Sequence, residues 1–365
     1  MRKKFAKIKI IYKFALMKMH LRISFVLGAL LAVLPSCSTD VDLLADGADV
    51  PIVYSLLDLD ADTNYVKITH TMNANGTAIN ANNPDLANYP GKLDVRMTEF
   101  CNGDSIRQFI FDTITIHNKE GGLFYSPAQK LYYTTEHLSK NTPGKNYSYR
   151  LYVVLPDRVV TADALAVGSE DFRIQTTVAD FSGGYHFLDE TKATHEIWFL
   201  AALNGGLYDV YMSFTYYERR DWTSDTIPRT FTWHMGTYYQ FFLPQYLHGD
   251  AFVIRYYPYD LYKHLYEFIG DDTLVPGLRR YLDDYPIQVT VTAGDRNIEE
   301  YVYYHNMNPH NTTGENYQTN VKGGYGVVST TKTIVGEMRL GGTTVPELVE
   351  ETKYGFKYVG GHLGE

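Results

Sequence analysis

The chain has 365 residues, with 33 basic and 42 acidic side chains, a formal net charge of −9, 15% aromatic residues and two cysteines, Cys37 and Cys101. This length accommodates about two domains, at roughly 100–200 residues per domain. The acidic balance excludes a nucleic-acid-binding class, which needs basic contacts to phosphate. Two cysteines are too few for a disulfide framework.

The first 36 residues form a basic segment followed by an apolar one. Eight basic residues and no acidic residue occur there, and the apolar run covers residues 23–34. A membrane-spanning helix needs roughly 20 apolar residues. We therefore predict an export signal over residues 1–36 rather than an anchor helix. The long basic part leaves Met17 or Met19 as alternative translation starts.

The predicted signal ends in Leu34-Pro35-Ser36-Cys37, which resembles the lipobox of bacterial lipoproteins. The resemblance implies that the Cys37 thiol receives diacylglycerol, that the chain is cut before Cys37, and that the new amine is acylated. Two or more acyl chains anchor a protein stably. The alternative is an ordinary secretory signal with a cysteine at its end by chance.

Removal of residues 1–36 changes the charge of the chain. It leaves 25 basic and 42 acidic residues, a formal net charge of −17. That charge argues against electrostatic attachment to anionic lipid. With Cys37 acylated, Cys101 has no intramolecular partner, and nothing near it in the sequence indicates an activated thiol. We expect the lipid anchor to be the contact with the membrane.

An acidic tether is expected over residues 37–50, and a first β-rich domain over residues 51–178. Alternating apolar and polar residues predict its strands, at 52–57, 65–70, 93–97, 109–111, 114–116, 147–155 and 172–176. Asn102-Gly103 predicts a hairpin turn. Pro143-Gly144 followed by Tyr147 is similar to the late corner of immunoglobulin-like and fibronectin-like sandwiches, where a tyrosine hydroxyl bonds back to the backbone.

A second β-rich domain is expected over residues 179–345, followed by a C-terminal tail over residues 346–365. Predicted strands include 195–200, 207–214, 231–234, 238–242, 287–291 and 333–335. Apolar residues at 3–4 spacing predict two short helices, at 259–269 and 298–307. The predicted fold class is therefore mainly β: an immunoglobulin/fibronectin-like sandwich and then a β domain with two short helices.

Several segments together resemble a family of uncharacterised outer-membrane lipoproteins of Bacteroidota that carries a domain of unknown function. The segments are 51–57, 65–68, 287–307 and 317–328, and the similarity spans about residues 50–340. The resemblance implies an outer-membrane location and a β-rich fold. It implies no established activity and supplies no catalytic residues.

One turn could be considered as a cation site. Asp58, Asp60, Asp62 and Asn64 place oxygen atoms at alternate positions, as calcium loops do. The glycine and glutamate of an EF-hand are absent, which favours a solvated hairpin tip.

Other candidate chemistry is sparse, and we predict no catalytic residue, no metal site and no cofactor. The histidines lack metalloprotease spacing, and no nucleophile elbow occurs. The carboxylate pairs Asp271-Asp272 and Asp283-Asp284 lie beside turn residues, which favours solvated turns. Gly323-Gly324-x-Gly326 lacks the lysine of a phosphate loop and predicts a tight turn.

Four Asp-Ser/Thr-apolar triplets resemble the O-glycosylation sequon of Bacteroidota. Their hydroxyl residues are Ser105, Thr113, Thr226 and Thr273, of which the last two lie nearest to turn residues.

A tyrosine-rich stretch at 208–268 could stack on sugars, but tyrosine also fills sheets well, and we favour packing. We expect a non-enzymatic binding or scaffolding protein of the cell envelope, either periplasmic or exposed on the surface. Its partner would be an envelope protein or a glycan. The alternative is a glycan-binding accessory protein of a nutrient-uptake system, with surface tyrosines or Trp222 as stacking platforms; a hydrolase comes third.

Overall fold

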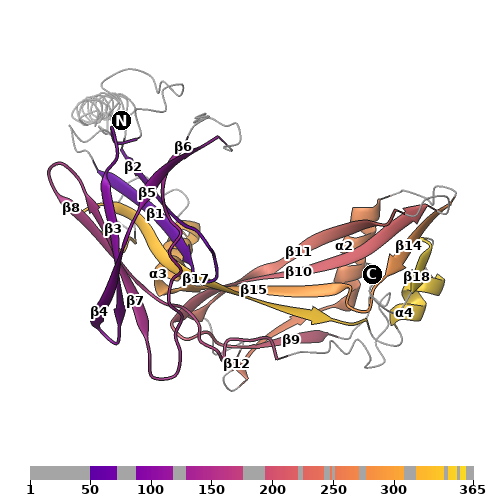
Figure 1. The fold of residues 1–365 in the computed structure, drawn as a ribbon. Coiled ribbons are helices and arrows are strands. Elements are labelled where there is room, and N and C mark those ends of the chain that lie inside the picture. Colours follow the sequence, from indigo (N-terminus) through magenta and orange to yellow (C-terminus); the bar gives the residue numbers. More distant parts are fainter. Residues whose placement is uncertain are drawn as a thin grey trace, which may run out of the picture. The chain divides into compact units, whose positions relative to one another are not determined.

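The structure, a computed structural model, describes the chain from residue 50 to residue 358 with gaps. The described residues are 50–71, 88–117, 129–175, 194–220, 225–241, 247–248, 251–270, 277–307, 318–340, 344–351 and 354–358. Two compact units divide the chain, Met1–Ala48 and Asp49–Glu365, and all described residues belong to the second. Strands predominate in it (Figure 1), which confirms the mainly β fold class.

The smaller of two extended sheets has five strands in the order β16-β8-β7-β3-β4. Their bounds are β3 Asp94–Cys101, β4 Asp104–Ile110, β7 Tyr147–Val154, β8 Val159–Leu165 and β16 Val321–Lys322. The predicted hairpin turn between β3 and β4 is confirmed. Asn102 and Gly103 both have positive φ, 52° and 94°, as such turns require.

The larger sheet has ten strands in the order β18-β14-β10-β15-β17-β1-β2-β6-β5, with β11 paired to β10. Their bounds are β1 Pro51–Asp58, β2 Asn64–His70, β5 Asp112–Ile116, β6 Gln129–Thr134, β10 Gly205–Arg220, β11 Ile227–Tyr239, β14 Leu278–Leu282, β15 Ile287–Asp295, β17 Tyr325–Met338 and β18 Phe356–Tyr358. Parallel pairing occurs at β1–β17 and β14–β18. The segment predicted as a C-terminal tail thus contributes β18.

A three-stranded sheet and short helices complete the described fold. The sheet consists of β12 Leu247–His248, β13 Ala251–Tyr256 and β9 His195–Leu200. The helices are α2 Pro258–Ile269, α3 Arg296–Met307, α4 Thr344–Pro346 and a π-helical turn at Glu347–Glu351. The two predicted helices are confirmed as α2 and α3. Across the described part of the chain, each helix is too short or too polar to cross a bilayer.

The parallel pair β1–β17 joins segments that are distant in the sequence. Ile52 lies opposite Tyr325, and Asp58 opposite Thr331. Beyond this point β17 continues as the neighbour of β15. Strands from both predicted domains therefore lie in one sheet (Figure 1). The predicted boundary near residue 178 lies outside the described residues and stays a prediction.

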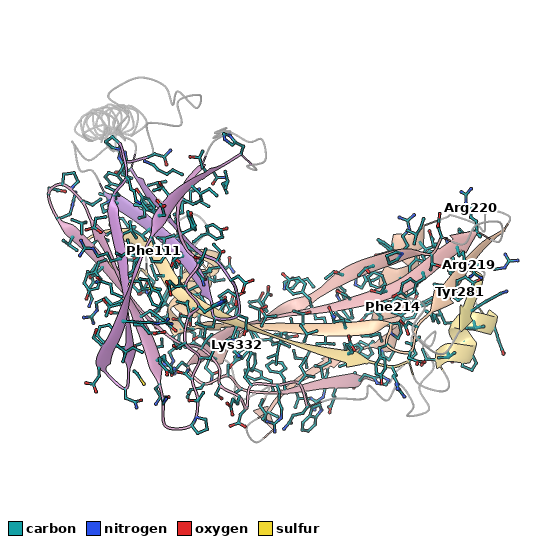
Figure 2. All side chains as sticks on the ribbon, viewed as in Figure 1. Phe111, Phe214, Arg219, Arg220, Tyr281 and Lys332 are labelled. Atoms are coloured by element: carbon teal, nitrogen blue, oxygen red, sulfur yellow. The ribbon has the colours of Figure 1, made fainter. Side chains whose placement is uncertain are left out.

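Alternating residues of both extended sheets build the core. On the smaller sheet, Met97, Leu151 and Val153 are buried, and on the larger sheet Val53 and Val66 are buried. Phe111 links the sheets, because it stands between β4 and β5 and donates its backbone N–H to the Val95 carbonyl at 3.0 Å (Figure 2).

The long β10 strand contributes aromatic residues to the same continuous core. Tyr208 and Phe214 are buried and share one face of β10; Figure 2 labels Phe214 on this strand. The rings of Phe199 and Phe252 stack with centroids 4.9 Å apart, and Phe252 lies 4.4 Å from Tyr208. The three-stranded sheet therefore packs on β10 through aromatic rings.

The bond from a tyrosine hydroxyl to the backbone that is predicted for Tyr147 is made by Tyr149 instead. The Tyr149 hydroxyl donates to the Ser139 carbonyl at 2.6 Å, whereas Tyr147 is only partly buried at the start of β7. Tyr149 lies opposite the buried Glu99, so its ring enters the core and its hydroxyl meets the preceding loop. The predicted closing strand at 172–176 is also wrong over its described part, because Ile174 makes only an isolated bridge to Phe199.

Candidate functional site

An open hollow lies where α3 crosses the exposed face of β1 and β2. We call it the tyrosine trough. Its volume is about 570 Å³, and its lining residues are Tyr54, Ser55, Leu56, Asp58, Ala61, Thr63, Asn64, Tyr65, Lys67, Leu131, Ile298, Tyr301 and Val327. These residues come from β1, the β1–β2 turn, β2, β6, α3 and β17, so the fold assembles the trough from distant parts of the chain.

Aromatic side chains form the most prominent wall of the trough. The Tyr54 and Tyr301 hydroxyl oxygens are 2.9 Å apart, and their rings meet edge to face at 80°. His305 stacks on Tyr301 with ring centroids 3.9 Å apart. On the strands, Tyr65 and Leu56 are 43% and 53% exposed. The trough thus presents half-exposed rings and aliphatic groups to solvent.

The β1–β2 turn forms the polar rim of the trough. Asn64 accepts the Asp58 N–H at 2.7 Å and donates to the Asp58 carbonyl at 3.1 Å. The Asp58 carboxylate accepts the Asp60 N–H at 2.9 Å, and Asp60 pairs with Lys140. These oxygens are therefore engaged with backbone and lysine groups, the arrangement of a closed hairpin tip. The described residues contain no group of three or more His, Cys, Asp or Glu side chains that could hold a metal ion.

A buried carboxylate fixes the start of α3. Asp295 is 1% exposed and follows the core residues of β15. Its carboxylate accepts the backbone N–H of Asn297 at 2.9 Å and the Ser329 hydroxyl at 2.6 Å. It also accepts the Leu165 N–H at 3.3 Å. Burial raises the pKa of Asp295 to about 6. This residue is the N-cap of the helix and also ties it to β8 and β17.

Two asparagine amides lock the same junction. Asn297 and Asn320 both donate to the Asp163 carbonyl, at 3.0 Å and 2.8 Å. Asn320 also donates to the Val328 carbonyl at 2.7 Å and accepts the Val328 N–H at 3.0 Å. The amides therefore clamp β8 of the smaller sheet to β17 of the larger one and hold α3 beside the trough.

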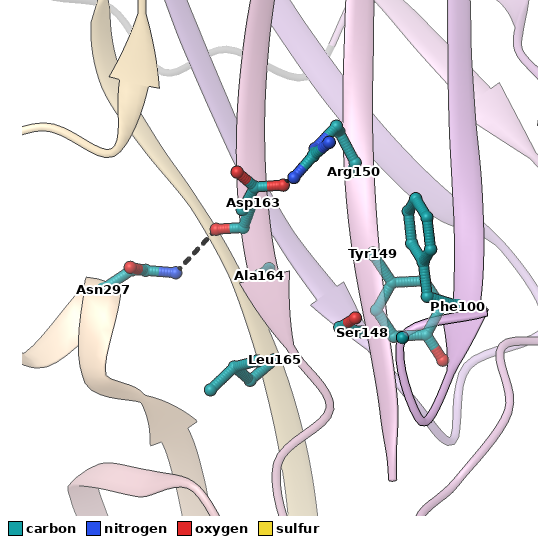
Figure 3. A pocket seen from close by; sticks show the side chains of 9 residues that line it. Phe100, Ser148, Tyr149, Arg150, Asp163, Ala164, Leu165 and Asn297 are labelled. Atoms are coloured by element: carbon teal, nitrogen blue, oxygen red, sulfur yellow. Dashed lines mark hydrogen bonds and ion pairs between the residues drawn. The ribbon is translucent and has the colours of Figure 1, made fainter. Parts of the chain in front are cut away.

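A second hollow lies on the other side of this junction, on β3, β7 and β8 (Figure 3). Its volume is about 520 Å³. Arg150 donates to Asp163 at 2.5 Å across its floor, and its guanidinium lies 5.7 Å from the Phe100 ring centre. Lys322 also approaches Asp163, at 3.4 Å. An arginine in a hollow indicates a site for an anionic ligand. Here, however, Arg150 and Lys322 are both paired with Asp163, so this hollow is a weak candidate for such a site.

Glu299 is a second buried carboxylate, one turn along α3. It is fully buried, and its Oε1 accepts the Phe241 N–H at 2.9 Å. Burial raises the pKa of Glu299 to about 7. The sequence interpretation missed Asp295 and Glu299. An aspartate directly before a helical pattern is a standard N-cap signal, and it would have identified Asp295.

The predicted modification sites lie on separate elements. Ser105 is exposed on β4, and Thr113 is half-buried on β5. Thr226, also half-buried, stands just before β11. Cys37, Thr273 and Trp222 lie outside the described residues. The structure therefore does not gather the described candidates into one site.

Most of the other residues singled out in the sequence occupy structural positions. The Asp284 N–H donates to Asp283 at 2.5 Å, within a turn. Cys101 is a partly exposed free thiol at the end of β3. In the tyrosine-rich stretch, Tyr208, Tyr216 and Tyr256 are buried, as the packing interpretation expected for them. His310 and the pair Asp271-Asp272 lie outside the described residues.

Comparison of the chain with models of known protein families and with curated proteins finds no match.

Proposed function

We propose that this chain is a lipid-anchored protein of the outer membrane, with a non-enzymatic role in binding or scaffolding. The observation that carries the proposal is the position of Cys37, directly after a basic segment and a short apolar run. The described body starts its first strand only 14 residues later, at Pro51. Acylation of Cys37 would therefore hold the β-rich body on a short tether.

The binding surface in this proposal is the tyrosine trough. Its half-exposed rings and aliphatic side chains offer apolar contact area, and its tyrosine hydroxyls offer hydrogen bonds, a combination common where proteins bind partners. The buried junction at Asp295 fixes α3, so Tyr301 is held in place before any partner arrives. Such preorganisation lowers the entropy lost on binding.

The Cys37→Ala variant is expected to lose membrane attachment. In the native host, the wild-type protein should sediment with membranes and partition into detergent, whereas the variant should remain in the soluble fraction, because it lacks the acyl chains. Protease treatment of intact cells would then separate a surface location from a periplasmic one. A wild-type protein that fractionates as soluble contradicts the proposal.

Mass spectrometry of the intact wild-type protein and the Cys37→Ala variant tests for attached lipid and attached sugar in one measurement. Three acyl chains on Cys37 would add a lipid mass that the variant lacks. Sugar on Ser105, Thr113, Thr226 or Thr273 would add hexose increments to both forms, and Ser105 is exposed on β4. A mass that equals the unmodified mature chain rules out both modifications.

For the fold, we propose an immunoglobulin/fibronectin-like sandwich over residues 51–178. The bond from the Tyr149 hydroxyl to the Ser139 carbonyl supports it, as does the shared core to which buried residues of β1, β2, β3 and β7 belong. Strands β16 and β17, from residue 321 onward, would complete its sheets.

Glycan binding, as an accessory protein of nutrient uptake, is the second candidate. Tyr54, Tyr65 and Tyr301 in one open hollow favour it, although the perpendicular rings of Tyr54 and Tyr301 offer no continuous flat platform. In affinity electrophoresis through polysaccharide gels, Tyr65→Ala should reduce retardation severalfold, because a stacking ring is worth roughly 1 kcal/mol. Tyr257→Ala is the control, since Tyr257 is 49% exposed and not part of the trough. Equal mobility of wild type and Tyr65→Ala in every gel contradicts glycan binding there.

A further inference from the structure

We propose that the end of the body at which β1 begins rests on the membrane surface and contacts zwitterionic lipid head groups. We call this region the anchor-proximal end: Pro51, Ile110, residues 154–159 and residues 322–325. The inference rests on the proposed acylation of Cys37. It adds the orientation of the body and the surface that meets the bilayer.

The point of attachment favours one end of the body as the end nearest to the anchor. The chain from Cys37 to Pro51 spans at most about 50 Å when fully extended, but a flexible chain of this length spans only about 20 Å on average. A lipid on Cys37 therefore keeps the start of β1 close to the bilayer on average and favours this end over the far ends of the strands.

Three distant segments meet at this point. A side chain at Gly324 would lie 2.6 Å from the Pro51 carbonyl oxygen, so these two backbones are in contact. The backbone at Gly323 similarly approaches the Val159 carbonyl. Val159 starts β8 opposite Val154, the last residue of β7. The start of β1 thus lies beside the β7–β8 turn and the start of β17.

Exposed apolar side chains surround this entry point. Val154 and Val159 are 39% and 53% exposed, and they are neighbours on the outer face of the smaller sheet. Tyr325, opposite Ile52, is 44% exposed. Ile110 is 71% exposed at the end of β4, on the same outer face through its pairing with Arg96. Val154 and Val159 are directly paired, and adjacent exposed apolar residues favour a contact surface.

Charge at this end favours a zwitterionic surface. The mature chain has a formal net charge of −17, which repels anionic lipid. At the anchor-proximal end, however, the charges are balanced in ion pairs. Arg158 pairs with Asp157 at 3.2 Å, and Lys322 pairs with Asp163 at 3.4 Å. Arg96 and Asp94, beside this end on β3, also pair with each other. Paired charges leave little net field, so neutral head groups can approach the valines.

Apolar exposure alone does not distinguish the two ends of the sheet. Leu165, at the opposite end of β8 and on the same face as Val159, is 49% exposed. Attachment of the tether is what distinguishes them. This pair therefore provides a matched test: two positions on one strand with similar side-chain exposure, of which only one lies near the start of β1.

The test uses the full acylated protein in phosphatidylethanolamine-rich vesicles that contain a spin-labelled quenching lipid. Val159→Cys and Leu165→Cys, each in a Cys101→Ser background, carry a thiol-linked fluorophore. Quenching at position 159 should exceed that at position 165 at least about twofold, because interfacial groups lie within about 10 Å of the acyl boundary. Both residues are surface positions, so labelling leaves the fold intact.

The outcomes separate the two proposals. Protein that fails to float with the vesicles overturns the acylation of Cys37 and the orientation with it. Protein that floats but shows equal quenching at both positions, or stronger quenching at 165, overturns the orientation alone. Stronger quenching at 159, repeated with Val154→Cys against Ile106→Cys, supports it.

Discussion

Replacement of Gly326 by alanine is expected to lower the free energy of unfolding by about 3 kcal/mol or more, enough to prevent accumulation of folded protein. Gly326 has a φ of 113°, in a region that residues with a side chain avoid. An added Cβ would lie 2.0 Å from the Val53 carbonyl oxygen and 2.8 Å from the Val53 carbonyl carbon. Both atoms belong to the backbone of β1, so relief requires β1 and β17 to separate.

Gly270→Ala is the matched control for this effect. Gly270 ends α2 with a φ of 69°, and an added Cβ there has no neighbour within 4 Å. With a ψ of −162°, Gly270 adopts a conformation that is essentially restricted to glycine, so alanine there should cost about 1–3 kcal/mol in strain without any steric clash. At Gly326 the backbone clash adds to a strain of this kind. Soluble yield and thermal unfolding followed by circular dichroism measure both variants. A Gly326→Ala protein that expresses and melts like Gly270→Ala would contradict the expected clash.

Gly326 also shows where sequence interpretation stops. Its glycine-rich neighbourhood predicts a tight turn, and Gly323 does have a positive φ. Gly326 instead lies inside β17, directly opposite Val53. The need for glycine comes from the close approach of a strand that is 273 residues away in the sequence. No local pattern contains that information.

Elements defined by local periodicity could be predicted, and contacts between them could not. The 3–4 spacing around Leu261 and Leu265 indicated α2. Asn102-Gly103 indicated the hairpin between β3 and β4. The choice between Tyr147 and Tyr149 depends instead on which residue lies opposite Glu99. Both tyrosines face the same side of β7, so alternation cannot separate them.

The tyrosine trough was beyond sequence interpretation for the same reason. Tyr54 and Tyr301 are 247 residues apart, and their hydroxyl contact exists only because β1 pairs with β17 and α3 lies across them. The asparagines at 297 and 320 likewise resemble ordinary loop residues in the sequence. They hold β8 and β17 together because their side-chain amides donate hydrogen bonds to the carbonyl oxygens of Asp163 on β8 and Val328 on β17.

Asp295→Ala is the second variant with a large expected effect. At low pH we expect a loss of about 3 kcal/mol in the free energy of unfolding, because the helix cap disappears and several buried donors lose their acceptor. Those donors include the Ser329 hydroxyl and the Leu165 N–H. Asp157→Ala is the control, since its carboxylate is 64% exposed in a surface ion pair and should change stability by less than about 0.5 kcal/mol.

The effect of Asp295→Ala should also depend on pH. The pKa of Asp295 rises from its ordinary 3.8 to about 6 in the folded protein. A carboxyl group with a raised pKa stabilises the fold fully below its unfolded pKa, and that contribution is lost as pH rises through the folded pKa. The free energy of unfolding of the wild type therefore falls by up to about 3 kcal/mol as pH rises through this interval, a loss that the variant cannot show. Urea unfolding at about pH 4.5 and pH 7.5 should show a larger difference between wild type and Asp295→Ala at the lower pH. An equal difference at both values would mean that Asp295 stays ionised throughout, with its hydrogen bonds outweighing the cost of burial.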